Sequence, residues 1–121
     1  MSRRRESSLP EQDCIFCKIV SGEAAANVVN RTDGFVAIQD INPKADVHLL
    51  VIPEHHIETF RDVSQLEADE AKRMLDFVAE TARKGGLEEY RLMVFVGPGA
   101  GQTVFHLHVH VLGGQLHRMP R

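Results

Sequence analysis

The segment TVFHLHVHVLGG places a histidine at every second position, at His106, His108 and His110, with apolar residues between them. Successive side chains of a β-strand point to opposite faces, so a strand here would have one apolar face and one imidazole face. A helix would instead put His106 and His110 together and His108 opposite them. The β-branched and aromatic residues between the histidines, and the glycines that follow, favour the strand. We therefore predict a strand over Val104–Leu112 that ends at Gly113-Gly114.

Four further segments have the composition of strands. Turn residues at Asp33-Gly34 and Asn42-Pro43 separate the first three of them, and a loop over Pro53–Val63 with a short helical turn follows the third. The strand candidates are Asn27–Arg31, Phe35–Gln39, Val47–Ile52 and Arg91–Val96.

Two helices are expected. Residues 65–84 carry apolar side chains at helical spacing, and Ser64 with Glu67 would form a capping box at the start of this long helix. A short helical turn is expected over Ile15–Val20, with Asp13 as its cap. One long helix among strands with hairpin-compatible neighbours predicts an α+β fold with a mostly antiparallel sheet.

The composition suits one domain and excludes several classes of function. A chain of 121 residues with 43% hydrophobic residues can bury one modest core. The net charge of −3 argues against binding to DNA or RNA, and no apolar run reaches the roughly 18 residues of a membrane span. Residues 1–11 are polar and charged, so we expect a disordered tail there and a folded domain over 12–121. These features predict a cytoplasmic protein without nucleic-acid or membrane partners.

Three interpretations of the histidine face are open. The histidines could be satisfied side chains on an amphipathic strand, they could bind a metal ion, or one of them could be a nucleophile that attacks phosphorus. The preceding loop, GPGAGQT, helps to choose among them. Its glycines let backbone N–H groups approach an anion, and Gln102 and Thr103 add side-chain donors next to the histidines. This arrangement favours a phosphate-binding loop beside an imidazole face.

The chain has two cysteines, Cys14 and Cys17, separated by two residues. In a reducing compartment this spacing favours a metal or redox role over a structural disulfide. A second cysteine pair that could complete a four-cysteine site is absent from the sequence, so two further metal ligands would have to be histidines. The alternative is a pair of reduced, buried cysteines without a metal.

The histidine segment closely resembles the signature of the histidine-triad (HIT) superfamily, His-φ-His-φ-His-φ-φ with φ apolar. The segment His106–Leu112 matches it at every position, and the resemblance extends from about Asp13 to His117 through CIFCKIVSGE, FVAIQDINP and HLLVIPEHHI. The residues Gly101-Gln102-Thr103 and Gly113-Gly114 resemble the Hint branch, the purine nucleoside phosphoramidases. The resemblance implies a HIT-like fold: a five-stranded, mostly antiparallel sheet with one long and one short helix, which dimerises into a continuous sheet.

The resemblance also implies a hydrolase that acts on adenosine-type nucleoside 5′-phosphoramidates or related esters and anhydrides. His108 would attack the α-phosphorus, and water would then release the nucleoside monophosphate from the nucleotidyl-histidine. His110 would contact the phosphate or the leaving group and help to protonate it, and His48 would orient the triad. The phosphate would be held by Gly101, Gln102 and Thr103.

Asp40 ends the apolar segment FVAIQD, and on its own it is typical of a residue that starts a turn. The resemblance implies instead that its carboxylate binds both ribose hydroxyls. The base would then lie against apolar walls, which core packing explains equally well. These walls are formed by Ile15, Phe16, Ile19, Ile38 and Ile41.

For members with this cysteine spacing, the resemblance implies a structural zinc ion. Its ligands would be Cys14, Cys17, His56 and His106. His55 is the adjacent competitor of His56, and only the family spacing from Pro53 favours His56. The triad would then be divided, with His106 structural and the other two histidines catalytic.

Two features depart from the Hint branch. Phe95 occupies the position at which Hint proteins usually carry an asparagine, and the chain has no tryptophan for the C-terminal tail that completes the partner subunit's site. The implied homodimer would use the apolar stripe of helix 65–84, which could equally cover the chain's own sheet. The alternatives to a phosphoramidase are a dinucleoside polyphosphate hydrolase and a nucleotide-binding regulatory protein with little activity.

Overall fold

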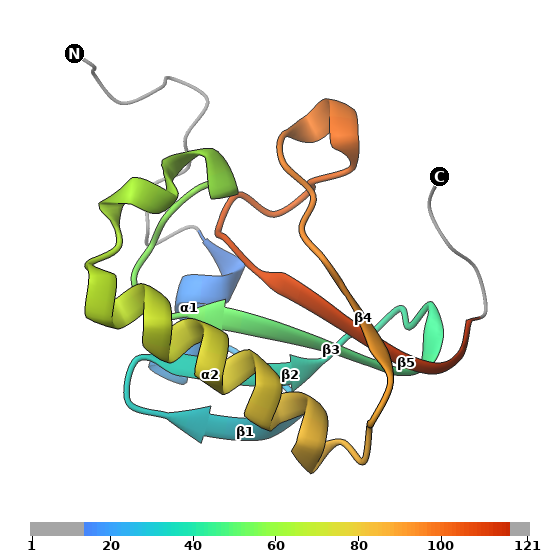
Figure 1. The fold of residues 1–121 in the computed structure, drawn as a ribbon. Helices are drawn as coiled ribbons and strands as arrows, with labels where there is room; N and C mark the ends of the chain where they lie inside the picture. Colours follow the sequence, from blue (N-terminus) through green and yellow to red (C-terminus); the bar gives the residue numbers. More distant parts are fainter. Residues whose placement is uncertain (1–13, 117–121) are drawn as a thin grey trace.

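The computed structural model describes residues 14–116, which contain one sheet of five strands (Figure 1). The strands are β1 (Val28–Thr32), β2 (Phe35–Gln39), β3 (Ala45–Pro53), β4 (Tyr90–Met93) and β5 (Val109–Leu116). Their order in the sheet is β1-β2-β3-β5-β4, and every neighbouring pair is antiparallel. The predicted α+β fold with a five-stranded antiparallel sheet is confirmed.

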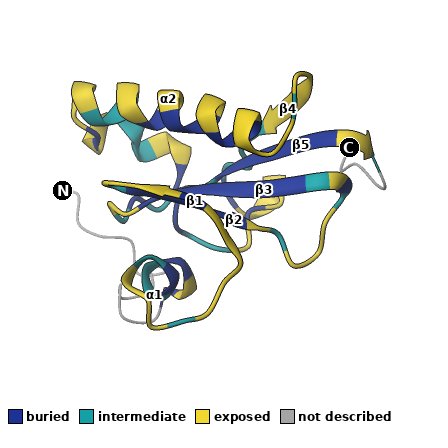
Figure 2. Ribbon diagram, turned by 90° about the horizontal axis from the view of Figure 1, so that it is seen from below, coloured by how far each residue is buried: buried dark blue, intermediate teal, exposed yellow. Residues whose placement is uncertain are grey.

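Two α-helices cover opposite faces of this sheet, as Figure 2 shows. The short helix is α1 (Ile15–Ser21) and the long helix is α2 (Ala68–Lys84). Within residues 14–116, two 3-10 helices lie in the connecting segments, η2 (Phe60–Gln65) and η3 (Pro98–Ala100). Within residues 14–116, neither length nor hydropathy would let any helix cross a membrane.

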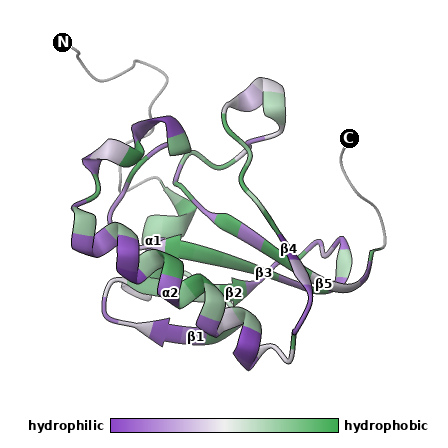
Figure 3. Cartoon of the chain, in the orientation of Figure 1, coloured by the Kyte–Doolittle hydropathy of each residue, from purple (hydrophilic) through white to green (hydrophobic). Residues whose placement is uncertain are grey.

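Alternation along the strands divides the core in two. Between the sheet and α2, the buried side chains are those of Phe35, Ala37, Leu49, Val51, Met74, Phe77, Val78, Val109 and Val111 with their neighbours. Between the sheet and α1, they are those of Phe16, Ile19, Val36, Ile38, Leu50 and Ile52. Because both faces are covered, β2 and β3 are apolar (Figure 3) and buried along most of their lengths.

The short helix α1 starts directly after Cys14, whose Sγ accepts a hydrogen bond from the Cys17 backbone N–H at 3.3 Å. It ends at Gly22, whose φ of 89° gives the left-handed conformation that favours glycine at a helix end. The predicted span Ile15–Val20 is therefore confirmed to within one residue. The predicted cap, Asp13, lies outside the described residues, as does the predicted tail over 1–11.

The predicted capping box of the long helix is wrong. The helix α2 begins at Ala68, and the side chain of Glu67 makes no capping hydrogen bond. Ser64 lies instead in η2, which begins after Thr59. Leu66 separates the two helices, because its backbone is extended and its side chain packs in the core beneath α2.

The strand β5 begins at Val109 rather than at Val104. The residues before it leave the sheet because their backbone bonds elsewhere: the Leu107 N–H donates to the Ile57 carbonyl oxygen at 2.6 Å. The strand β4 is likewise shorter than predicted and ends at Met93.

The glycine pair lies inside β5 and does not end it. A Cβ atom on Gly113 would collide with the side chain of Leu87, and one on Gly114 would lie 2.8 Å from the Cβ of Asp46. The glycines therefore allow close packing against the strand. The prediction that they end the strand is wrong.

Candidate active site and cysteine–histidine cluster

The three triad histidines lie where the end of β3 meets the start of β5, on the face of the sheet that α1 covers. His110 is in β5, and His106 and His108 precede the strand. Their side chains still alternate with those of Leu107 and Val109, which pack in the core beneath α2. His106 is fully buried (0% exposed), His110 is 8% exposed and His108 is partly exposed. The structure thus brings the three imidazoles to one face, as the alternation predicts.

His106 belongs to a cluster with Cys14, Cys17 and His56 at the start of α1. The Cys17 Sγ lies 3.1 Å from His56 Nδ1 and 3.5 Å from His106 Nδ1, and the Cys14 Sγ lies 3.3 Å from His106 Nδ1. The two Nδ1 atoms are 3.2 Å apart, and the four possible ligand atoms all lie within 4.8 Å of one another. Two sulfurs and two imidazole nitrogens at such distances are the donor set of many structural zinc sites.

The proton of His106 is placed so that this histidine can act as a metal ligand. Its Nε2 lies 2.7 Å from the Pro53 carbonyl oxygen, so the neutral ring donates its N–H there and presents an Nδ1 lone pair to the cysteines. Burial lowers the pKa of His106 to about 4, which keeps the ring neutral. The competitor His55 lies elsewhere, with its Nδ1 3.2 Å from the carboxylate of Glu70. This geometry favours His56 over His55 in the cluster.

The tautomer of His108 suits a nucleophile. Its Nδ1 lies 2.7 Å from the His106 carbonyl oxygen and donates the ring proton to it, so the lone pair is on Nε2. The ring packs edge-to-face on Phe16 of α1, with centroids 4.9 Å apart. Burial lowers the pKa of His108, against the opposing effects of its bond to His106 and the charge of Asp40. The ring is therefore neutral at neutral pH, as a nitrogen nucleophile must be.

His48 and His110 form a hydrogen-bonded pair beside Asp40. The Lys44 N–H donates to His48 Nδ1 at 3.0 Å, so the neutral His48 ring carries its proton on Nε2. This Nε2 lies 2.9 Å from His110 Nδ1 and 3.3 Å from Asp40 Oδ2. Since His110 Nδ1 accepts, the proton of His110 is on Nε2, which has no hydrogen-bond partner among residues 14–116. Within the described part of the chain, the pair thus keeps one buried N–H donor without a partner, on a residue that lines the cavity described below.

Burial also sets the charge of this pair. It lowers the pKa of His48 in spite of the attraction of Asp40, and it lowers the pKa of His110 to about 4 together with repulsion from His108 and His48. The ligand atoms of Asp40, His48 and His110 also lie within 4.8 Å of one another. A metal ion there would need a lone pair on His48 Nε2. Because Lys44 donates to Nδ1, Nε2 carries the ring proton and has no free lone pair. The arrangement therefore favours proton transfer over metal binding.

A cavity of about 590 Å³ opens between α1, β2 and the triad. Its walls are largely apolar, and Asp40, Thr103, His108 and His110 line it. The predicted nucleotide-binding residues in its lining are Ile15, Phe16, Ile19, Ile38, Asp40, Ile41 and Thr103. Sequence reasoning missed the other lining residues, which are Ala25, Ala26, Asn27, Gln39, Asn42, Leu50 and Val104. Leu50 lies two positions after His48 in β3, so the period of a strand could have found it.

Comparison with known proteins agrees with this site. The family model for the scavenger mRNA decapping enzyme C-term binding domain matches residues 13–119. An uncharacterized HIT-like protein of Helicobacter pylori is 41% identical over 106 residues, which cover 85% of this chain and 98% of that protein. The chain belongs to the histidine-triad (HIT) family.

Other HIT relatives have informative names. A purine nucleoside phosphoramidase of Escherichia coli is 37% identical over 106 residues, which cover 86% of this chain and 89% of that enzyme. The crystal structure of a HIT family hydrolase from Legionella pneumophila is 40% identical, with a TM-score of 0.78 and coverage of 89% of this chain and 98% of the hydrolase. A histidine triad protein from Clostridium difficile has a TM-score of 0.79 at 32% identity, with 98% of both chains covered.

In this HIT protein the side chain of Gln102 forms hydrogen bonds with the backbone in and around the glycine loop, residues 97–103. Gln102 is 4% exposed, and its Nε2 donates to the carbonyl oxygens of Glu58 at 2.7 Å and Val104 at 3.0 Å. Its Oε1 accepts from the Gly97 N–H at 2.9 Å. Both amide protons are thus bound to backbone, and neither Gln102 nor Gly101 is in the lining of the cavity. The implied phosphate contact of Gln102 finds no free donor in this arrangement.

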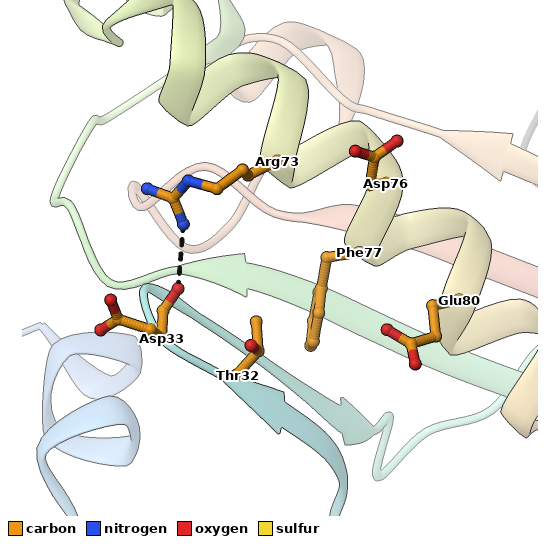
Figure 4. A pocket seen from close by; sticks show the side chains of 6 residues that line it. All are labelled: Thr32, Asp33, Arg73, Asp76, Phe77 and Glu80. Carbon is orange, nitrogen blue, oxygen red and sulfur yellow. Dashed lines mark hydrogen bonds between the residues drawn. The ribbon is translucent and has the colours of Figure 1, made fainter.

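A second cavity lies on the other face of the sheet, between α2 and the turn from β1 to β2 (Figure 4). It measures about 350 Å³, and Arg73 reaches across it to donate to the Asp33 carbonyl oxygen at 3.1 Å. Its lining consists of Thr32, Asp33, Arg73, Asp76, Phe77 and Glu80. This lining includes neither histidine nor cysteine.

Proposed function

We propose that this HIT protein hydrolyses purine nucleoside 5′-phosphoramidates through a covalent intermediate on His108. The observation that carries the proposal is the orientation of His108, whose Nδ1–H is held by the His106 carbonyl while the ring lines the cavity. The apolar walls suit a base, and the name of the Escherichia coli relative, purine nucleoside phosphoramidase, supports the same substrate class.

In the first step His108 Nε2 attacks the α-phosphorus, and the bond from phosphorus to the leaving amine breaks. The leaving nitrogen keeps the electron pair of that bond and takes the proton that His110 carries on Nε2, and His110 recovers a proton from solvent. His108 is then a phosphorylated imidazolium. Water attacks the same phosphorus, the bond to His108 breaks, and the nucleoside monophosphate and one proton are released.

The other polar residues of the cavity bind the nucleotide. Asp40 Oδ1 accepts the Asn42 N–H at 2.8 Å, and the remaining lone pairs of this carboxylate can accept hydrogen bonds from ribose hydroxyls. Thr103 and the backbone N–H groups of the glycine loop would stabilise the charge on the phosphate oxygens. Gln102 holds that loop in place through its backbone bonds.

Cys14, Cys17, His56 and His106 would hold a structural zinc ion. The donor set fits, because His106 directs an unprotonated Nδ1 toward both sulfurs. Coordination there would tie the start of α1 to the residue whose carbonyl orients His108. The proposed thiolate ligands need a reducing environment, which agrees with the predicted cytoplasmic location.

We also propose a homodimer that forms through β4 and α2. The strand β4 is at the edge of the sheet, and Leu92 is 50% exposed on the face that α2 covers, where Leu75 is 63% exposed. Exposed apolar side chains beside an unpaired strand edge are the surface that a second copy would cover. Sedimentation should show a dimer for the wild type and a monomer for Leu92→Lys. A monomeric wild type would contradict this part of the proposal.

The test of the enzyme uses an adenosine 5′-phosphoramidate with a fluorescent amine as leaving group. We expect amine release by the wild type, none by His108→Ala, and unchanged release by His55→Ala, whose side chain lies outside the cavity. A wild type that binds AMP but releases no amine would favour the nucleotide-binding alternative. Cleavage of dinucleoside polyphosphates without amine release would favour the polyphosphate hydrolase.

A further inference from the structure

Phe95 lies beside His110, at a part of the site to which no function has yet been assigned. The ring centroids of the two residues are 4.9 Å apart, and their planes are inclined at 39°. A Cβ on Gly101 would lie 3.6 Å from the Phe95 ring, so the ring also packs against the glycine loop. Phe95 is only partly buried. It therefore forms an apolar wall between the proton donor and the loop.

The order of the strands places Phe95 and the nucleotide cavity on opposite sides of His110. The strand β5, which carries His110, lies between β3 and β4. Ile38 of β2 and Leu50 of β3 line the cavity, whereas Phe95 follows β4, whose Met93 pairs with His110. Neighbouring strands are about 4.8 Å apart, so a substrate across β5 would hold its nucleoside over β2 and β3 and its leaving group toward β4.

The proton donor fixes where the leaving atom must lie. His110 Nε2 has no hydrogen-bond partner among residues 14–116, and a general acid must be within hydrogen-bond reach of the atom that it protonates. Substituents on that atom would therefore reach Phe95. An aromatic ring attracts apolar and aromatic groups, but it cannot compensate the lost hydration of an anion.

Among residues 14–116, three cations lie around this region, and two of them are not placed to offset that cost. Arg91 is on the same face of β4 but lies four residues from Phe95, which is about 13 Å along an extended chain. Lys44 precedes β3 and acts on His48 and His110 from the nucleotide side. The third, Arg61 of η2, approaches Gly97, two residues after Phe95, but its side chain is exposed, and an exposed charge contributes little.

We infer that Phe95 determines the leaving group and selects neutral apolar or aromatic amines over groups that carry negative charge. This inference rests on the proposed function and deepens it, because it names the class of amine. It also explains why a polyphosphate, whose leaving group is strongly anionic, would be a poor substrate for this chain.

The experiment uses two substrates that share the nucleotide half, the adenosine 5′-phosphoramidates of benzylamine and of 4-sulfobenzylamine. For the wild type we expect kcat/KM to favour the neutral amine by roughly tenfold or more, the size of a modest desolvation penalty. Phe95→Leu should keep the preference, whereas Phe95→Lys should lower the ratio or reverse it. Arg61→Ala is the matched control and should leave the ratio unchanged. AMP affinity and the thermal midpoint check that each variant is folded.

The outcomes separate the inference from the proposed function. A wild-type ratio near one, or a ratio that Phe95→Lys does not change, would overturn the inference and leave the phosphoramidase standing. A ratio that depends on Arg61 instead would place the leaving group toward η2, which also overturns it. A wild type that binds AMP but cleaves neither substrate contradicts the proposed function, and the inference falls with it.

Discussion

The two faces of the sheet follow the same alternation but differ in what they bury. The α2 face is an apolar core beneath a helix of 17 residues. The α1 face carries the triad and His48, and its helix of seven residues leaves a cavity of about 590 Å³ uncovered. Burial disfavours the charged forms of these histidines, so that face loses stability as acid protonates them. The comparison indicates that the α2 face stabilises the fold, whereas the α1 face carries the residues of the proposed chemistry.

The largest expected effects come from one substitution on each face. Phe77 is 3% exposed and stacks on Phe35 with centroids 5.8 Å apart, so Phe77→Ala should lower the free energy of unfolding by about 3–5 kcal/mol. Its amine release per folded molecule should stay near that of the wild type. His108→Ala should abolish amine release with little change in stability, because His108 is partly exposed.

Denaturant unfolding and amine release, measured on the same preparations, check this pair. The division of roles would be refuted if Phe77→Ala lost activity while the protein remained folded. It would also be refuted if His108→Ala unfolded the chain.

Acid should lower the free energy of unfolding through the buried histidines of the α1 face. The pKa of His110 is about 4 in the folded protein against 6.5 for the unfolded chain, so the unfolded chain binds the proton first as pH falls. Stability should therefore be constant above pH 6.5 and decline by up to about 3 kcal/mol toward pH 4. In the metal-free protein His106 contributes in the same direction, with a pKa also near 4. In urea unfolding measured across this pH range, the free energy of unfolding of His110→Asn should decline less steeply than that of the wild type. An equal decline in both proteins would count against this assignment.

The sequence predicted the two faces well because alternation is a property of extended chain. It held for His106 and His108 even though they lie outside the sheet. Signals that depend on distant neighbours were misread. The glycine pair looked like a stop because Leu87 and Asp46, which pack against it, are far away in the chain. The capping box failed because burial of Leu66 overrode a local pattern.

The sequence predicted which residues form the site but not which of their atoms carry protons or accept hydrogen bonds. Resemblance selected the cysteines, the triad and Asp40, and the structure brings these groups together. The tautomers could not be predicted, because they depend on backbone partners such as the Pro53 carbonyl and the Lys44 N–H. For the same reason Gln102 reads as a phosphate donor in the sequence, although Glu58 and Val104 accept both of its protons.

Metal removal tests whether the cysteine–histidine cluster adds stability to the α1 face. A chelator should lower the free energy of unfolding by about 2–3 kcal/mol, the contribution of a ligand present at 100 times its dissociation constant. Cys17→Ala should be insensitive to the chelator, whereas His55→Ala should respond as the wild type does. Metal analysis of the purified protein accompanies the measurement. A zinc-free wild type whose stability ignores the chelator would support the alternative of reduced cysteines without a metal.

The smallest expected effect concerns Gln102, whose side chain either holds the glycine loop in place or contacts the phosphate. Gln102→Met keeps the length of the side chain but removes its hydrogen bonds to the Gly97 N–H and the Val104 carbonyl, at a cost of about 1–2 kcal/mol in stability. If Gln102 only holds the loop, kcat of the variant should fall because Thr103 and His108 are displaced. In the wild type, the NMR signals of the Gln102 side-chain amide should then be protected from exchange and insensitive to AMP. Large shifts of those signals with AMP, and none with adenosine, would show instead that the amide turns to the phosphate. Thr103→Val is the control, because a residue that contacts the phosphate should lose AMP affinity without loosening the loop.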